Sequence, residues 1–239
     1  MVRRIVRAFT PHPDDVTVEI GPGEGVLTRE LAPSVKVLHV IEIDAELCRR
    51  LGQDAALRDV HVHHADALRF PLCDLVPGGP QLRLIGNLPY NISTPLLFRL
   101  FGHRACVRDM LFMFQQEVVA RIVAHAGGKD YGRLSVMAQF FCDAQPVLNV
   151  SPSAFWPVPR VHSAVVHLTP RLKLPLSGAR LALFEDIVRH AFSQRRKTLR
   201  NSLRDLVDEE RMRGIGIDPV RRAETLSLAE FVALTEAVA

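Results

Sequence analysis

The feature that most constrains the fold is a short apolar strand that leads into a turn of three alternating glycines. Residues 16–20 read Val-Thr-Val-Glu-Ile, and Gly21, Gly23 and Gly25 follow. Residues 26–31 then have the pattern of a short helix. Small residues let a ligand approach the backbone, and the N–H groups at the start of a helix can bind it. The sequence therefore predicts a strand, turn and helix that form part of a ligand site in an α/β domain.

Strands and helices alternate through the rest of the first half of the chain. We expect strands at residues 36–43, 60–64, 82–86 and 107–114, and helices at residues 45–51, 94–101, 116–125 and 133–141. This alternation gives parallel strands with right-handed crossovers, and ligands then bind at the carboxyl ends of the strands. Residues 146–150 and 163–168 form two late strands without a crossover helix between them. We expect these two to pair antiparallel on an otherwise parallel sheet.

The pattern changes near residue 170. Helical periodicity replaces the strand signals in residues 181–192, 197–207 and 227–238. We therefore expect a Rossmann-like domain over residues 1–172 and a small helical domain over residues 173–239.

Composition excludes several classes of protein. The 239 residues are 48% hydrophobic and 23% charged, which is enough for a buried core. The sequence shows neither an apolar stretch long enough to cross a bilayer nor the apolar segment of a signal peptide, so we expect a cytoplasmic protein without a membrane partner. The formal charge of +4 is compatible with a polyanionic partner.

The cysteines and histidines do not form a recognisable metal site. The four cysteines are widely spaced and lack a Cys-x-x-Cys pair, so we expect buried thiols rather than a disulfide framework or a zinc site. His61, His63 and His64 have no acidic or cysteine partner in the pattern. We interpret them as structural or surface residues and expect no metal.

Three predicted strand ends carry residues suited to a nucleoside. Glu42 ends the second strand and can accept both hydroxyls of an adenosine ribose, as acids at this position do in dinucleotide folds. Asp66 follows the third strand and can accept the amino group of the adenine, while Ile43 can pack on the face of the ring. Each residue alone also fits an ordinary loop. The glycine turn alone leaves a nicotinamide-dependent oxidoreductase open as an alternative.

Asn87-Leu88-Pro89-Tyr90 follows the fourth predicted strand. The side-chain oxygen of Asn87 and the Leu88 carbonyl, which precedes the fixed proline, can each accept a hydrogen bond. The ring of Tyr90 can stack on a base. An ordinary turn is the alternative, because Asn and Pro both favour turns. Beside a nucleoside site, the motif predicts a pocket for a planar amine.

In this order and position, these motifs resemble those of the adenine-N6 methyltransferases that use S-adenosylmethionine. The narrower resemblance is to the small-subunit rRNA adenine-N6 dimethyltransferases, the KsgA/RsmA-like family. It extends over nearly the whole chain through residues 155–164 (FWPVPRVHSA), 192–203 (FSQRRKTLRNSL) and 221–227 (RRAETLS). Members usually begin with a basic arm and a Gln-Asn-Phe-Leu segment that closes over the cofactor. We expect this chain to lack that arm and to begin inside the helix that follows it, at residues 3–9.

The resemblance implies a class I methyltransferase fold, S-adenosylmethionine as cofactor and N6-dimethylation of two adjacent adenosines near the 3′ end of small-subunit rRNA. The implied catalytic residues are Asn87, Leu88, Pro89 and Tyr90, and Tyr90 and Phe155 are expected to stack on the target base. The expected cofactor-binding residues are Glu19, Gly21, Gly23, Glu42, Ile43, Asp66, Ala67 and Asn87. We expect a monomer that acts in ribosome biogenesis on a pre-ribosomal 30S-type particle.

A basic run lies at the start of the predicted helical domain. Residues 189–204 contain six Arg or Lys and no acid, and Arg196, Arg200 and Arg204 recur at a helical spacing that puts them on one face. We expect contacts to RNA phosphates, which weaken steeply with salt, from Arg195, Arg196, Lys197, Arg200 and Arg204. A solvated helix face is the usual alternative.

Two related functions stay open. One is the large-subunit rRNA adenine-N6 methyltransferase that confers antibiotic resistance, which residues 221–227 disfavour. The other is a non-catalytic assembly factor that grips rRNA through the basic run.

Overall fold

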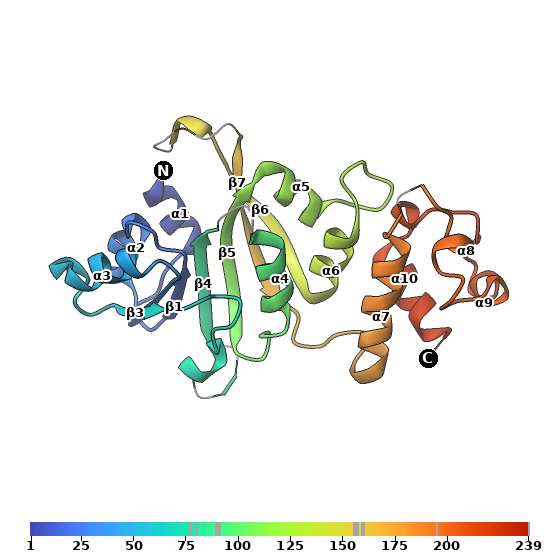
Figure 1. The fold of residues 1–239 in the computed structure, drawn as a ribbon, viewed down its shortest axis with the longest axis horizontal. Helices are drawn as coiled ribbons and strands as arrows, with labels where there is room; N and C mark the ends of the chain where they lie inside the picture. Colours follow the sequence, from blue (N-terminus) through green and yellow to red (C-terminus); the bar gives the residue numbers. More distant parts are fainter. Residues whose placement is uncertain are drawn as a thin grey trace. The chain divides into compact units, whose positions relative to one another are not determined.

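The computed structural model describes residues 1–76, 78–79, 81–88, 92–154, 158, 161–194 and 196–238 (Figure 1). The chain forms two compact units, the first of residues 1–119 and 142–172 and the second of residues 120–141 and 173–239. Residues 120–141 therefore belong to the helical unit. The expected single boundary between residues 172 and 173 did not include them there. The Gly127 N–H donates to the carbonyl oxygen of Glu224 at 2.7 Å, which joins these two stretches of the second unit.

The first unit is built on a seven-stranded sheet in the order β3-β2-β1-β4-β5-β7-β6 (Figure 1). The strands are β1 Val16–Ile20, β2 Val37–Glu42, β3 His61–His64, β4 Leu82–Asn87, β5 Val107–Gln115, β6 Cys142–Val150 and β7 Ser163–Pro170. The first five pair parallel, whereas β7 pairs antiparallel with both β5 and β6. This arrangement confirms the expected mostly parallel sheet and its late antiparallel pairing. The carboxyl ends of the first five strands share one edge of the sheet.

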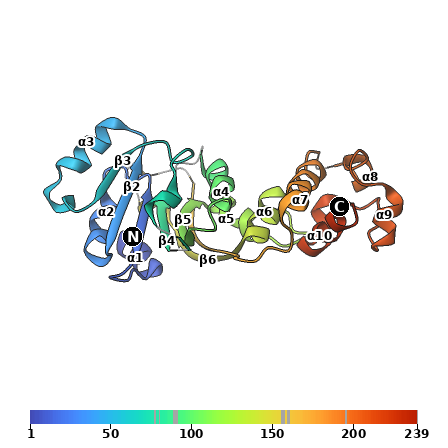
Figure 2. The ribbon, with the colours of Figure 1, turned by 90° about the horizontal axis from the view of Figure 1, so that it is seen from below.

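Helices cover both faces of this sheet. They are α1 Val2–Phe9, α2 Val26–Leu31, α3 Ala45–Gln53 and α4 Ser93–Phe101, with short 3-10 turns η1 Ala32–Ser34, η2 Ala55–Leu57, η3 Leu72–Leu75 and η4 Pro152–Ala154. Helix α5 Gln116–Val123 follows β5, and its residues are divided between the first unit and the second. On one face, Phe9 and Leu31 pack in a buried cluster with Val40, Ile85 and Leu111 of the sheet. Helix α4 lies over β4 and β5 on the opposite face (Figures 1 and 2).

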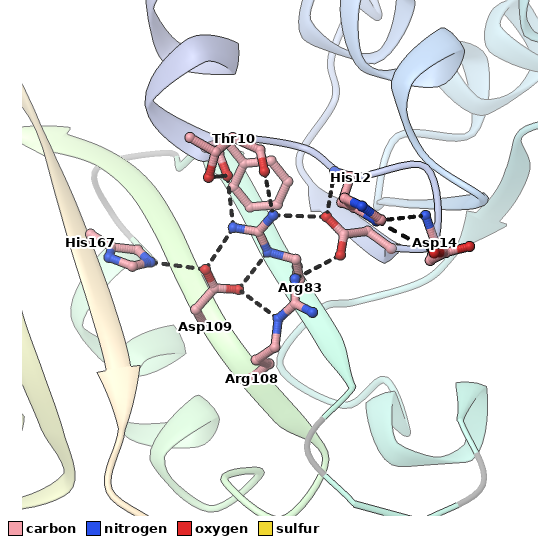
Figure 3. Close-up of polar contacts among 9 residues, drawn as sticks. Thr10, His12, Asp14, Arg83, Arg108, Asp109 and His167 are labelled. Atoms are coloured by element: carbon pink, nitrogen blue, oxygen red, sulfur yellow. Dashed lines mark hydrogen bonds and ion pairs between the residues drawn. The ribbon is translucent and has the colours of Figure 1, made fainter.

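A buried arginine ties α1 to the amino-terminal ends of the strands (Figure 3). Arg83 of β4 is 6% exposed, and its guanidinium makes two 2.8 Å bonds to Asp109 of β5 and one 2.8 Å bond to Asp15. It also donates to the carbonyls of Phe9 and Thr10, at 2.7 and 2.9 Å, and lies over the Phe9 ring. These five bonds use all five guanidinium donors and satisfy carbonyls at the end of α1.

The two acids of this cluster are also bonded to other groups. Asp109 contacts His167 of β7 at 2.9 Å, and Asp15 accepts a 2.6 Å bond from Arg108. Burial raises the pKa of Asp109, but the bonds from Arg83 and His167 outweigh burial and lower that pKa to about 2. The acid is therefore ionised and paired at neutral pH. The apolar neighbours of Arg83 in residues 82–86 gave no indication of this buried charge.

The second unit consists of helices. They are α6 Arg133–Phe141, α7 Gly178–Ala191, α8 Leu199–Ser202, α9 Glu209–Gly214 and α10 Leu228–Glu236, with the 3-10 turn η5 Ala223–Thr225. Helices α6, α7 and α10 lie side by side (Figure 2). Phe140 of α6 stacks on Phe184 of α7 with ring centroids 4.2 Å apart. A capping box of Ser227 and Glu230 begins α10, because each side chain bonds the backbone N–H of the other residue.

The helix expected over residues 197–207 is wrong in its extent. Helix α8 has only four residues, so Arg196 and Arg204 lie outside it and do not share a helix face with Arg200. The backbone here bonds to a distant stretch instead: the Leu199 N–H donates to the Arg221 carbonyl at 2.8 Å. This bond pairs an N–H group of the first turn, which has no partner within the helix, and α8 ends at Ser202.

The expectation of four buried thiols is also wrong. Cys73 and Cys106 form a disulfide, and Cys48 is half-buried, whereas Cys142 is a buried thiol. The disulfide partners are 33 residues apart. Their proximity arises from the pairing of β4 with β5: η3 leads into β4, and the N–H of Leu82, the first residue of β4, donates to the Cys106 carbonyl at 2.9 Å.

His61 and His63 lie on one face of β3 beside His39 of β2. The rings of His39 and His61 stack at 4.8 Å, and His39 Nδ1 lies 3.0 Å from His63 Nε2. Burial and the two neighbouring imidazoles lower the pKa of His39 to about 4, so the His39 ring is uncharged at neutral pH. Within the described ranges, no group of three or more His, Cys, Asp or Glu is arranged to hold a metal ion. No helix in the described part of the chain is long and apolar enough to span a membrane.

Candidate active site

Glu42, the last residue of β2, holds together the carboxyl ends of β1 and β2. Its Oε2 accepts a 3.2 Å bond from the Gly23 N–H, while Oε1 accepts bonds from the N–H groups of Ile43 and Asp44 at 2.8 and 3.0 Å. The residue is 8% exposed. Glu42 therefore fixes the glycine turn and the start of the segment that follows β2. Among the described residues, Oε2 accepts only one bond and keeps capacity for a ligand hydroxyl.

Glu19 lies inside β1 and is almost completely buried, at 2% exposure. Its Oε2 accepts a 2.7 Å bond from the hydroxyl of Thr28 in α2. Burial raises the pKa of Glu19 to about 7; the Thr28 bond opposes this shift and the charge of nearby Glu42 adds to it. At neutral pH this carboxyl is thus poised between its protonated and ionised forms. Thr28 was not predicted as a site residue, because only the fold brings it to Glu19.

Two glycines leave room at this edge of the sheet. Gly23 has a φ of +55°, and no described atom lies within 4 Å of the position that a Cβ on it would occupy. A ligand can therefore approach its backbone closely. Gly86, near the end of β4, has no room for a side chain, because a Cβ there would lie 2.5 Å from the Ile20 carbonyl oxygen. It lets β1 and β4 approach each other where the site begins.

The residues after β2 and β3 lie next to each other. Ile43 is 67% exposed, which is unusual for a large apolar side chain. The Ala65 N–H donates to the Glu42 carbonyl at 2.9 Å and brings Asp66 and Ala67 close to the end of β2. Oδ1 of Asp66 accepts a 2.9 Å bond from the Leu68 N–H, and its side chain is 37% exposed. The structure thus brings the predicted adenine contacts to one place.

Asn87 and Leu88 lie at the end of β4, beside β1. Asn87 is exposed and pairs with Met113 of β5, while Leu88 is 1% exposed and its N–H donates to the Met113 carbonyl at 3.3 Å. Met113 is a neighbour that the sequence pattern did not identify. Pro89, Tyr90, Phe155 and Arg195 lie outside the described residues.

The other predicted RNA-binding residues lie in the second unit. Four of the residues predicted to bind RNA phosphates are described: Arg196, Lys197, Arg200 and Arg204. All four are exposed. Arg204 lies 3.4 Å from Asp205, and both side chains are largely exposed, so this ion pair is weak.

Parallel strands β1 to β5, with β7 inserted antiparallel beside β5, give the fold of the class I methyltransferases. The sequence profile of the family described as ribosomal RNA adenine dimethylase matches residues 1–239. The chain belongs to this family.

Named relatives and solved structures agree with this assignment. Ribosomal RNA small subunit methyltransferase A of Tolumonas auensis is 46% identical over 231 residues, which cover 96% of this chain and 86% of the relative. The protein of the same name from Yersinia pestis is 46% identical over 98% of this chain and 87% of its own.

The fold matches two solved structures over almost its whole length. A dimethyladenosine transferase from Plasmodium falciparum superposes with a TM-score of 0.83 at 26% identity, covering 98% of this chain and 93% of that chain. The 23S rRNA methyltransferase ErmE superposes with a TM-score of 0.74, also at 26% identity, covering 99% and 96%.

Proposed function

We propose that this protein transfers methyl groups from S-adenosylmethionine to the N6 atoms of adenines in small-subunit rRNA. The observation that carries the proposal is the order of the strand ends. Asp66 follows β3, Glu42 ends β2, Gly23 follows β1 and Asn87 ends β4, and these strands are neighbours in the sheet. The residues proposed for a nucleoside site and the residue proposed to accept an amine therefore come from neighbouring strands. The named relatives at 46% identity support small-subunit rRNA as the substrate.

The residues present fit the methyl donor. Glu42 has acceptor capacity for ribose hydroxyls, Ile43 offers an exposed apolar side chain to a purine, and Asp66 offers a half-exposed carboxylate. Gly23 leaves its backbone accessible, Gly21 and Ala67 are proposed as further contacts, and Glu19 is held by Thr28 two residues before the turn begins. When bound, S-adenosylmethionine supplies an activated methyl group for in-line displacement. The protein contributes position more than reactivity.

The amine is held by Asn87 and Leu88 in this proposal. Hydrogen bonds from the adenine N6 to the Asn87 side-chain oxygen and the Leu88 carbonyl favour a pyramidal nitrogen whose lone pair points at the methyl group. Pro89 fixes the backbone after this carbonyl, and Tyr90 and Phe155 stack on the base. No dedicated general base is needed, because the nitrogen becomes strongly acidic as it is alkylated, so that its proton would pass to water while the thioether product of the cofactor leaves.

The helical unit binds RNA phosphates in this proposal. Arg196, Lys197 and Arg200 supply positive charge, together with Arg195 and Arg204. The substrate is two adjacent adenosines near the 3′ end of the rRNA, each methylated twice. The protein acts as a monomer, in the cytoplasm, on a partly assembled small subunit during ribosome biogenesis.

Transfer of a labelled methyl group tests the proposal. We expect incorporation from S-adenosylmethionine into immature small subunits, and mass spectrometry of the digested rRNA to find N6-dimethyladenosine. Large-subunit rRNA serves as the second substrate, and preferential labelling there indicates the resistance-type activity instead. Salt-sensitive binding to small-subunit rRNA without any incorporation would leave only the non-catalytic assembly factor.

A further inference from the structure

A cavity of about 410 Å³ opens at the carboxyl end of β5. It is lined by Gln115, Gln116, Glu117, Val161 and His162. Two backbone contacts join its walls: Gln115 pairs with Ser163 of β7, and the Gln116 N–H donates to the His162 carbonyl at 2.9 Å. The volume is within the range of small-molecule sites. None of the roles assigned above uses this cavity.

Its position relates it to Asn87. Along the carboxyl edge of the sheet, β5 is the strand after β4, on the side opposite to β1 and β2. Asn87 pairs with Met113, and Gln115 follows two residues later on the same face of β5. At the usual rise of a strand, the two positions on β5 are roughly 7 Å apart. Asn87 therefore has the proposed cofactor residues on one side and the cavity on the other.

The part of the lining that the structure describes suits a base better than a phosphate. The described residues around the cavity include no Lys or Arg, and Glu117 contributes a carboxylate. Gln115 and Gln116 each carry an amide with both donors and an acceptor. Val161 is 39% exposed and adds an apolar wall. A Gln amide can bond two adjacent polar atoms of adenine at once, which is a common way for proteins to read that base.

We propose that this cavity binds the base of the nucleotide adjacent to the adenosine being methylated, and that it selects adenine there. The proposal rests on the function proposed above and adds a second base subsite to it. One adenine of the pair lies against Asn87 while its neighbour bonds Gln115 and Gln116. A preference for adenine beside the target adenosine then follows from the spacing between the end of β4 and the end of β5.

The test compares immature small subunits that carry either adenosine or uridine beside the target adenosine. For the unaltered protein, we expect the initial rate of methylation at the target to fall about tenfold with uridine, corresponding to the loss of one amide–base pairing. The variant Gln115→Leu/Gln116→Leu should methylate both substrates at the lower rate. Gln145→Leu, on an exposed position of β6, is the matched control and should keep the tenfold preference.

The outcomes separate this proposal from the one on which it rests. The melting temperature of each variant, with and without S-adenosylmethionine, shows whether the fold and the cofactor site are intact. Gln116→Leu alone, at an exposed position, replaces the double variant if that variant does not fold, and it should reduce the preference. Equal rates on both substrates for the unaltered protein, or an undiminished preference in the Gln variants, overturns the second subsite and leaves methylation standing. Absence of transfer to every substrate overturns both proposals.

Discussion

The carboxylate of Glu42 accepts a hydrogen bond from the backbone N–H of Gly23 at 3.2 Å, across 19 residues of sequence. The acid that ends β2 therefore also determines the shape of the turn that follows β1. One side chain links the two parts of the proposed cofactor site, and damage to it should affect both.

Replacing Glu42 with Gln should weaken the binding of S-adenosylmethionine by about tenfold or more. The side chain keeps its size, but one acceptor oxygen becomes an NH₂ group that faces backbone N–H donors at Gly23 or at Ile43 and Asp44. Isothermal titration calorimetry measures the Kd. Glu46→Gln, on the exposed surface of α3, is the control and should leave the Kd unchanged. A normal Kd in Glu42→Gln contradicts the role assigned to this acid.

Replacing Asn87 with Ala should abolish methyl transfer while largely preserving RNA binding. Asn87 is exposed at the end of β4, so its truncation removes an acceptor without opening a hole in the core. Single-turnover transfer and filter binding of rRNA provide the two measurements. An active Asn87→Ala protein would refute the part given to this amide.

Glu19 should make the protein less stable as the pH rises. Its pKa is raised from 4.5 to about 7 in the folded state, so the native protein holds this proton more tightly than the unfolded chain does. The stabilisation is complete below about pH 4.5 and is lost as the pH rises through 7, by about 3 kcal/mol in total. Urea unfolding should give a lower free energy of unfolding at pH 8 than at pH 5 for the unaltered protein. In Glu19→Gln, this contribution to the pH dependence should be absent. Glu24→Gln, an exposed residue of the same turn, should behave like the unaltered protein.

Replacing Asp109 with Asn should destabilise the first unit by about 3–5 kcal/mol, because it leaves the buried Arg83 without its bidentate partner. Guanidinium unfolding monitored by circular dichroism measures the change. Asp59→Asn removes only an exposed partner of Arg58 and should have little effect. An equally small loss of stability in Asp109→Asn would mean that other groups compensate the buried charge of Arg83.

Reversing the charge of Arg200 should weaken RNA binding and reduce its dependence on salt. Removal of one bond to a phosphate lowers the slope of log K against log salt by about 0.7–0.9. Titrations of rRNA at several salt concentrations give the slope for Arg200→Glu. Arg58→Glu, also exposed but in the first unit, is the control. Identical slopes for the two variants place the RNA-binding surface elsewhere.

Local signals predicted much of the fold. Helices α2 and α6 and strand β1 have the expected bounds. Each begins directly after a glycine or an acid that acts locally, namely Gly25, Gly132 and Asp15. Residues that end parallel strands meet at one edge, so the positions of Glu42, Asp66 and Asn87 could also be predicted. Their roles in binding and catalysis stay predictions.

Interactions between distant residues could not be predicted. Arg83 has apolar sequence neighbours, and only the pairing of β4 with β5 shows that Asp109 lies opposite it. Periodic arginines favoured a long helix over residues 197–207, yet α8 has only four residues, and the N–H of its first residue, Leu199, bonds the distant Arg221 carbonyl. The disulfide of Cys73 with Cys106 depends likewise on a packing that sequence spacing does not reveal.

The position of β7 determines the order in which the sheet can be completed during translation. Strands β1 to β5 are all present once Gln115 has left the ribosome, but the free edge of β5 pairs only with β7, which ends at Pro170. Nascent chains between these lengths carry an open edge from Met110 to Gln115, the kind of edge that promotes aggregation. Closure of this edge also brings Ser163 beside Gln115. The half of the sheet that carries the proposed cofactor residues can thus form before the wall of the second base subsite exists.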